Sequence, residues 1–336
     1  MAHIDVDGTP APTLGRKKVG MDMAYKGVWG CHPLVVSLAN TGEALYLVNR
    51  PGNAVSHSGA AGWIDRAVAL VAPHAERVCV RGDPDFSLTA NFDCWSEEAD
   101  FIFGFDAHPA MVKRAEALEE SARERLERRP RYTTRTGTTR SGREDVKARI
   151  VCERGYVNKR LNFEDVAEYE YRPTKCRKAC RMVVVRKNII RMKGELTLLD
   201  EVRYFFHITT RRDIGAAEVV RLANARCEHE NVIARLRSVA NALRVPPYDL
   251  VSNRAYMVMA ALAWNLKSWF AMMMHLKADG KRYVAMEFRR FIREMILLPC
   301  QVIRRARRTT PRIIGWQPTT DRLFSAWRTI ERTGFT

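Results

Sequence analysis

The sequence contains no long uninterrupted apolar segment of the kind that crosses a membrane. Its most apolar window, residues 255–276, is interrupted by Asn265, Lys267, Ser268 and His275. Polar groups at this density are costly in lipid, so we expect a buried helix here and no membrane partner. A secretory leader is not expected either, because two aspartates stand within the first seven positions.

The sequence also lacks the cysteine spacing of a disulfide framework. Its eight cysteines are scattered from Cys31 to Cys300, mostly in apolar surroundings, which is typical of reduced core thiols in a cytosolic protein. Cys176 and Cys180, with His207, come nearest to a zinc pattern. We do not expect zinc there, because the spacing is loose and the pattern offers no fourth ligand.

Acidic residues are few beside basic ones. The chain has 38 Asp and Glu against 56 Lys and Arg, which gives a net charge of +18. This excess favours a partner rich in phosphates, because each cation placed on a phosphate releases a condensed counterion. We therefore expect nucleic acid as the partner. A basic protein without a polyanionic partner is the alternative, and charge alone does not exclude it.

A carboxylate stands at the end of each of two predicted strands. Residues 2–9 alternate apolar and acidic side chains and end in Gly-Thr, which predicts a strand with Asp7 at its carboxyl end. Residues 77–86 repeat this arrangement and place Asp83 after a glycine. Metal sites gather at the carboxyl ends of strands, so we predict that Asp7 and Asp83 share a divalent cation. Asp5 is the alternative to Asp7, because it shares the same face of the strand.

The remaining pattern predicts strands and helices in alternating blocks. In chain order we expect a loop at 10–33, hairpin strands at 34–38 and 44–48, a helix at 60–72, strands up to Asp83 and at 101–105, a charged helix at 110–128, a basic loop at 129–145, a β-rich block at 146–210 with strands at 148–152, 182–185 and 202–209, and helices at 216–243, 253–276, 285–298 and 300–308.

Charged residues on two of the predicted helices suggest function. Glu230 follows Arg226 by four positions and precedes Arg237 by seven, so the three lie on one helical face. A solvated charged stripe explains this spacing as well. Residues 285–308 carry seven arginines, which favours helices that contact the DNA backbone, with a solvated face as the even alternative.

Three segments occur together in the order of one known family. They are IDVDGT at 4–9 followed by KGVWGCHPL at 26–34, NRPGN at 49–53 followed by RGDPDF at 81–86, and RCEHENVI at 226–233. Jointly they resemble the group-1 DDE transposases of bacterial insertion sequences. The resemblance runs from about residue 3 to about residue 270 and implies a ribonuclease H-like catalytic core.

The resemblance implies metal-dependent DNA cleavage and strand transfer during transposition. Asp7, Asp83 and Glu230 are then the three catalytic acids and the ligands of two Mg²⁺ ions, for which Mn²⁺ can substitute. Arg226 and Arg237 are the implied DNA contacts, although the family usually carries Lys in place of Arg237. The implied partners are terminal inverted repeats, target DNA and a second copy of the chain in a homodimer. The implied location is the cytoplasm, at the nucleoid.

The expected fold class is α/β: a ribonuclease H-like mixed sheet flanked by helices, with a β-rich insertion before the helix that carries Glu230. We expect the first part of the core at 1–110, the charged helix and basic loop at 111–145, the insertion at 146–210, the helical remainder of the core at 211–280 and a basic helical region at 281–336. Family members carry an extra segment before the first catalytic strand, whereas this chain begins at the strand. A truncated, inactive copy is therefore an alternative interpretation.

Two other functions agree with parts of the sequence. A non-catalytic DNA-binding protein descended from a transposase would keep the basic charge but would not cleave DNA. Residues 5–9, DVDGT, also resemble the nucleophile loop of haloacid dehalogenase-type phosphatases, with Asp5 phosphorylated and Asp7 as the acid. Against the phosphatase, the strands after the first are predicted to be hairpin-linked, and a small phosphate ester does not explain the charge of +18.

Overall fold

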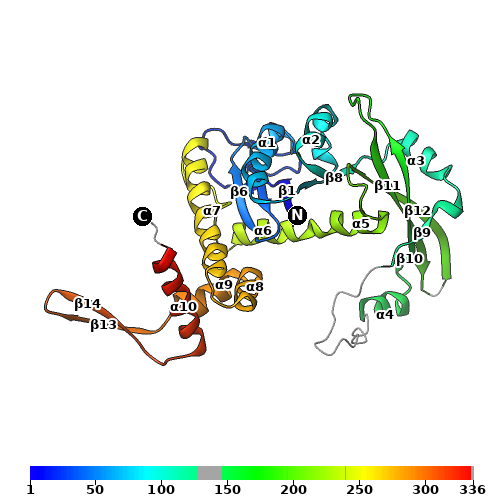
Figure 1. Ribbon diagram of the computed structural model, residues 1–336. Helices are drawn as coiled ribbons and strands as arrows, with labels where there is room; N and C mark the ends of the chain where they lie inside the picture. The colour runs from blue at the N-terminus through cyan, green and yellow to red at the C-terminus, as the bar shows by residue number, and fades with distance from the viewer. Residues whose placement is uncertain (128–145, 195, 239, 334–336) are drawn as a thin grey trace. The chain divides into compact units, whose positions relative to one another are not determined.

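The computed structural model describes residues 1–127, 146–194, 196–238 and 240–333 (Figure 1). The chain forms two compact units, one made of Met1–Val80 with Arg226–Thr336 and the other of Arg81–Ala225. The predicted basic loop at 129–145 lies outside the described residues. None of the described helices is both long enough and apolar enough to span a membrane.

The first unit is built on strands in the order β6-β5-β1-β7. Strand β1 (Ala2–Gly8) pairs antiparallel with β5 (Leu34–Leu38), and β5 pairs antiparallel with β6 (Glu43–Val48). Gly42 in the turn between β5 and β6 has φ of +75°, in the left-handed region that favours glycine. The predicted hairpin is thus confirmed, and β7 (Val78–Gly82) is the strand that ends before Asp83.

The register of β1 against β5 decides which face the acids occupy. Residues directly opposite each other in an antiparallel pair project to the same side, and Asp5 lies opposite Ser37 while Asp7 lies opposite Val35. Val35 belongs to a hydrophobic core beneath α6 (Cys227–Ser238) and α7 (Leu250–Met272). Both aspartates therefore face the side of the sheet that α6 and α7 cover.

The other elements of the first unit complete these layers. Helix α1 (Ala60–Val71) packs its apolar residues on β1, β5 and β6. The rest are β2 (Ala11–Pro12), β3 (Asp22–Met23), β4 (Trp29–Cys31), the 3₁₀ helix Ala72–His74, α8 (Lys277–Ala285), α9 (Phe288–Phe291), a π-helical turn (Ile292–Ile296), β13 (Cys300–Arg305), β14 (Arg308–Ile313) and α10 (Pro318–Thr333).

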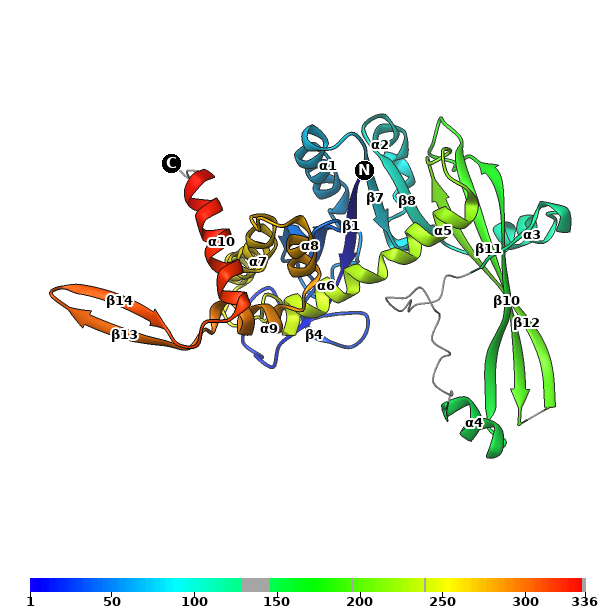
Figure 2. The same cartoon turned by 60° about the horizontal axis from the view of Figure 1, so that its bottom comes forward.

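The second unit is dominated by long antiparallel strands (Figure 2). Their order is β8-β12-β11-β10-β9, and their bounds are β8 (Asp100–Phe105), β9 (Glu124–Arg125), β10 (Val157–Tyr171), β11 (Cys180–Lys193) and β12 (Leu196–Thr209). Its helices are α2 (Phe92–Glu98), α3 (Pro109–Glu116), α4 (Val146–Glu153), α5 (Ala216–Ala225) and the 3₁₀ turns Pro84–Phe86, Thr89–Asn91 and Glu120–Ala122. The predicted β-rich segment before the helix of Glu230 is confirmed. The predicted order of three strands, a helix and two further strands is also confirmed by β1, β5, β6, α1, β7 and β8, with the short strands β2–β4 and helix α2 added between them.

Several local predictions are wrong. Residues 148–152 lie in helix α4 instead of a strand, and residues 10–33 contain three short strands. The helix predicted at 110–128 ends at Glu116, and the one predicted at 216–243 is α5 followed by α6, which ends at Ser238. Helix α2 was not predicted, because its seven residues are fewer than the window of about 11–18 residues in which helical periodicity can be recognised.

The predicted arginine-rich helix at 300–308 is also wrong, because this segment forms the hairpin β13–β14. Neighbouring β-branched residues, Val302 with Ile303 and Thr309 with Thr310, favour strands. Pro311 lacks the amide hydrogen that a continuing helix would need. These local preferences outweigh the helix propensity of the arginines.

A buried lysine on α7 makes the stability of the first unit depend on pH. Lys267 donates from Nζ to the carbonyl oxygens of Val284 at 2.7 Å and Met286 at 2.5 Å, and burial lowers its pKa to about 8. Between pH 8 and the ordinary lysine value of 10.5, the unfolded chain binds more protons than the folded one, so stability rises with pH. We expect urea denaturation to show that wild type gains about 2–3 kcal/mol over Lys267→Met from pH 7 to pH 10. A difference that stays constant over this range would contradict the assignment.

Candidate functional site

Asp7 lies near the end of β1 on the face that α6 covers. Its side chain is 18% exposed, and it accepts a hydrogen bond from Arg226 Nη1 at 3.1 Å. Burial is the main cause that raises the pKa of Asp7; Arg226 and the backbone of Gly8 oppose this, and the negative charge of Glu230 adds to it. The first unit therefore brings Asp7 and Glu230 close enough for their charges to interact.

The buried residue next to Glu230, His229, anchors helix α6 to the sheet and so sets the position of Glu230. Glu230 is exposed in the first turn of α6, where the helix dipole favours carboxylates. The preceding residue, His229, is buried, and its Nδ1 shares a hydrogen bond of 2.7 Å with Ser37 Oγ on β5. This bond fixes the rotation of α6 over the sheet and thereby holds Glu230 near Asp7.

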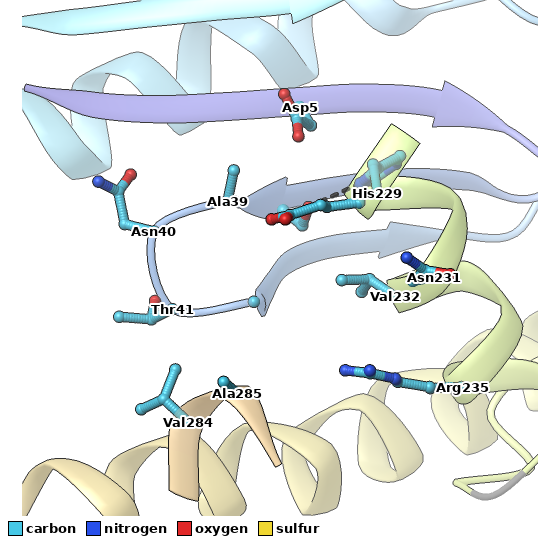
Figure 3. Close-up of a pocket in the computed structure, with 13 residues that line it drawn as sticks. Asp5, Ala39, Asn40, Thr41, His229, Asn231, Val232, Arg235, Val284 and Ala285 are labelled. Carbon is cyan, nitrogen blue, oxygen red and sulfur yellow. Dashed lines mark hydrogen bonds between the residues drawn. The ribbon is translucent and has the colours of Figure 1, made fainter. Parts of the chain in front are cut away.

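A pocket of about 240 Å³ adjoins α6 and the β5–β6 turn (Figure 3). Asp5, Ser37 and His229 line one side of it, and Arg235 supplies a positive charge. Asp5 is fully buried at this wall. Of the two aspartates on β1, Asp7 is thus the one paired with Arg226, while Asp5 lines the pocket.

Arg237 ties the far end of α6 to the segment that leaves β1. Its Nη2 donates to Thr9 Oγ1 at 2.7 Å and to the carbonyl oxygen of Pro10 at 3.0 Å. The residue is otherwise exposed. Arg226, Glu230 and Arg237, which the sequence places on one helical face, therefore all act on residues 7–10.

A buried arginine, Arg50, closes the end of β1, and the sequence alone does not indicate this role. Arg50 donates to the carbonyl oxygens of His32, Ser56 and Ser58 at 2.9, 2.8 and 2.8 Å, and burial lowers its pKa to about 10. A Cβ on Gly8 would lie 2.8 Å from His32 Cε1, so a side chain does not fit there. The NRPGN motif contains Arg50, but the carbonyls that it binds cannot be identified from the motif.

Asp83 belongs to the second unit and follows β7 directly, as predicted. Its Oδ1 accepts a hydrogen bond from the backbone of Asp85 at 3.0 Å and caps the 3₁₀ helix Pro84–Phe86. A Cβ on Gly82 would lie 2.9 Å from Phe86 and 3.0 Å from Phe103, which explains the glycine before the acid. That Asp83 shares a cation with Asp7 stays a prediction.

Within the described ranges, no three His, Cys, Asp or Glu side chains are grouped so that they could hold a metal ion. Asp7 and Glu230 both belong to the first unit, where the charge of Glu230 adds to burial in raising the pKa of Asp7. Their mutual repulsion, with one of them partly buried, is a setting that a divalent cation stabilises, and carboxylates are the hard ligands that Mg²⁺ prefers.

The structure argues against a haloacid dehalogenase-type phosphatase. Asp5, which would be phosphorylated, lies in the wall of the pocket but has no solvent-accessible surface, whereas a nucleophile must be accessible to its substrate. The strand after β1 in the sheet is an antiparallel neighbour joined by a hairpin to β6, whereas that family links its central strands through helices.

Comparison with known families identifies the chain. The family model described as transposase DDE domain group 1 matches residues 2–335. The protein therefore belongs to the group-1 family of transposase DDE domains, and the resemblance found in the three sequence segments is confirmed. This family generally uses divalent metal ions.

Among solved structures, the chain is similar to a piggyBac transposase determined by cryo-EM in a synaptic complex with hairpin DNA. The two share 10% sequence identity with a TM-score of 0.40, over 88% of this chain and 54% of the other. This chain thus spans about half the length of that transposase. No curated protein matches the sequence.

Proposed function

We propose that this protein is a transposase that cleaves DNA at the ends of an insertion sequence and joins the freed 3′ ends to target DNA. One observation supports the proposal most strongly. Asp7 is partly buried and forms an ion pair with Arg226, and the negative charge of Glu230 contributes to the raised pKa of Asp7. This arrangement occurs in a chain that belongs to the transposase DDE family.

In this proposal Asp7, Asp83 and Glu230 are the ligands of two Mg²⁺ ions, which Mn²⁺ can replace. Bound cations of this kind activate an attacking hydroxyl and stabilise a leaving oxygen. Asp7 is held by β1 and by Arg226, and Glu230 is held by the Ser37–His229 hydrogen bond beneath α6. Asp83 is held by its cap on the 3₁₀ turn. Each carboxylate is thus oriented by its own element before DNA arrives.

Arg226 and Arg237 are proposed as the contacts to DNA. A guanidinium has five N–H donors, and the hydrogen bonds of Arg226 to Asp7 and of Arg237 to Thr9 each use one terminal nitrogen. The remaining donors suit phosphate oxygens, which guanidinium groups bind in a bidentate manner. Arg226 directly precedes α6 and contacts Asp7, and Arg237 lies in the last turn of α6 and contacts Thr9, so phosphates bound by either arginine would lie near the end of β1.

The oligomeric state and the cellular location follow from the proposed reaction. Transposition acts on two DNA ends, so we propose that a homodimer forms on the terminal inverted repeats, with one catalytic centre for each end. A protein that works on chromosomal DNA in this way would act in the cytoplasm at the nucleoid. The net charge of +18 supports such a partner.

The proposal is tested by incubating the purified protein with a supercoiled plasmid that carries the terminal repeats of the element. Nicked circles and strand-transfer products are expected in Mg²⁺ or Mn²⁺ and are not expected in EDTA. Tight binding of the repeats without nicking in either metal would contradict the transposase activity. That result would favour the non-catalytic DNA-binding descendant.

A further inference from the structure

The β13–β14 hairpin is an arginine-rich arm. Its two strands pair with each other alone in the described sheets, and Figures 1 and 2 both show it extending away from α9 and α10. Residues 299–314 contain no Asp or Glu. The hairpin exposes five arginines, none of which has an ion pair among the described residues: Arg304, Arg305, Arg307, Arg308 and Arg312.

The register gives the hairpin two chemically different faces. Arg305 lies directly opposite Arg308, and Arg312 projects to the same face. The other face is more apolar, with the exposed Val302 opposite Pro311. Like charges directly opposite each other destabilise an antiparallel pair. The basic face therefore gains stability when an anion lies against it.

The turn at the tip is also unfavourable by itself. Ala306 has φ of 45° and Arg307 has φ of 61°, in the left-handed region that Asn and Gly normally occupy in two-residue hairpin turns. Arg307 holds a guanidinium at the tip in spite of this backbone strain. The opposed arginines in the strands and the left-handed residues in the turn both lower the stability of the isolated hairpin. The hairpin nevertheless keeps its positive charge.

The dimensions of the hairpin match duplex DNA. Two six-residue strands reach about 20 Å and lie about 4.8 Å apart. The major groove of B-DNA is about 12 Å wide and admits a two-stranded β-ribbon. The major groove of an RNA duplex is too narrow for side chains to read. Charge and shape together therefore favour double-stranded DNA as the occupant.

We propose that the β13–β14 hairpin is a DNA-binding arm that enters the major groove of duplex DNA and sets Arg305, Arg308 and Arg312 against the phosphates. The inference rests on the proposed DNA substrate. It assigns part of the affinity to a surface that contains none of the three acids, so binding by the arm and cleavage by the acids are separable.

The test measures the affinity of the full chain for a fluorescent 30-base-pair duplex in EDTA at several salt concentrations. The double variant Arg305→Ser/Arg308→Ser is compared with Arg328→Ser/Arg332→Ser, which removes two exposed arginines from α10 and changes the net charge equally. We expect the hairpin variant to bind about 10-fold more weakly near 0.15 M salt, with a salt slope less steep by about 1.8. The α10 variant should bind within about 2-fold of wild type, with an unchanged slope.

Equal losses in the two double variants would overturn the proposal, because net charge alone would then explain binding. If the hairpin variant lost as much affinity for single-stranded DNA of the same sequence as for the duplex, the proposed insertion into a groove would be overturned. Thermal denaturation should give the hairpin variant a melting temperature at or above that of wild type, because the opposed charges are removed.

The experiments distinguish an error in the proposed DNA-binding role of the hairpin from an error in the proposed transposase activity. If the catalytic proposal fails, no nicking is seen with wild type, yet the hairpin variant still loses duplex affinity. If the arm fails, the hairpin variant binds the duplex as wild type does, whatever the nicking activity.

Discussion

Replacing any one of the three acids by its amide, as Asp7→Asn, Asp83→Asn or Glu230→Gln, is expected to reduce Mg²⁺-dependent nicking by roughly 10³-fold or more. An amide keeps the size of the side chain but removes the negative charge that balances a divalent cation. Asn at position 83 still offers an oxygen to cap the following turn, so folding is preserved. Duplex affinity in EDTA should change by less than about 3-fold. Nicking is measured as the initial rate of open-circle formation, and affinity by fluorescence anisotropy.

Matched controls come from the neighbouring acids. Glu228→Gln changes an exposed carboxylate in the same turn of α6, and Asp85→Asn changes one two residues after Asp83. Both should nick DNA at rates within about 3-fold of wild type, since neither is assigned to the cation. Full activity in Asp7→Asn would instead direct attention to Asp5 as the first acid.

Trp264→Ala is expected to lower the free energy of unfolding of the first unit by about 3–5 kcal/mol. The indole is 2% exposed, its Nε1 donates to the carbonyl oxygen of Gly42 at 2.7 Å, and its ring centroid lies 5.2 Å from that of Phe288. Truncation would open a cavity under α7 and leave the β5–β6 turn without this donor. Urea denaturation monitored by circular dichroism measures the loss.

The control for this substitution is Trp327→Ala on α10. Trp327 is 58% exposed and donates to the exposed Glu331 at 2.7 Å. Its truncation should cost less than about 1 kcal/mol, because little apolar surface is buried there. Similar losses in the two variants would show that α7 does not pack on the β5–β6 turn as described.

The elements that were predicted correctly have strong local signals. The β5–β6 hairpin follows from a turn sequence with glycine, and β1 follows from strict alternation that ends in Gly-Thr. Each of these signals lies within a few residues of sequence. The pairing of Arg226 with Asp7 was not predicted. The spacing of Arg226, Glu230 and Arg237 predicted one face of a continuous helix, whereas the helix is interrupted at Arg226, between α5 and α6.

The parts that were missed depend on partners far along the chain. The Ser37–His229 hydrogen bond joins residues 192 positions apart, and nothing local to either residue identifies the other. Arg50 binds three backbone carbonyls, which have no signature in the sequence. The hairpin β13–β14 was predicted as a helix because its arginines suit helices, whereas its β-branched residues and Pro311 prevail in the fold.

We propose that Asp7, Asp83 and Glu230 together form one binding site for divalent cations. The most direct test replaces Mg²⁺ by Fe²⁺ and adds hydrogen peroxide, which the bound iron reduces to hydroxyl radicals, with ascorbate to regenerate Fe²⁺. The radicals cut the nearby backbone, and mass spectrometry maps the new ends. If the three carboxylates share the cations, cuts are expected in three segments, around residues 7, 83 and 230, and excess Mg²⁺ should suppress all of them. Cuts around Asp7 and Glu230 with none near Asp83, or cuts that persist in excess Mg²⁺, would contradict it.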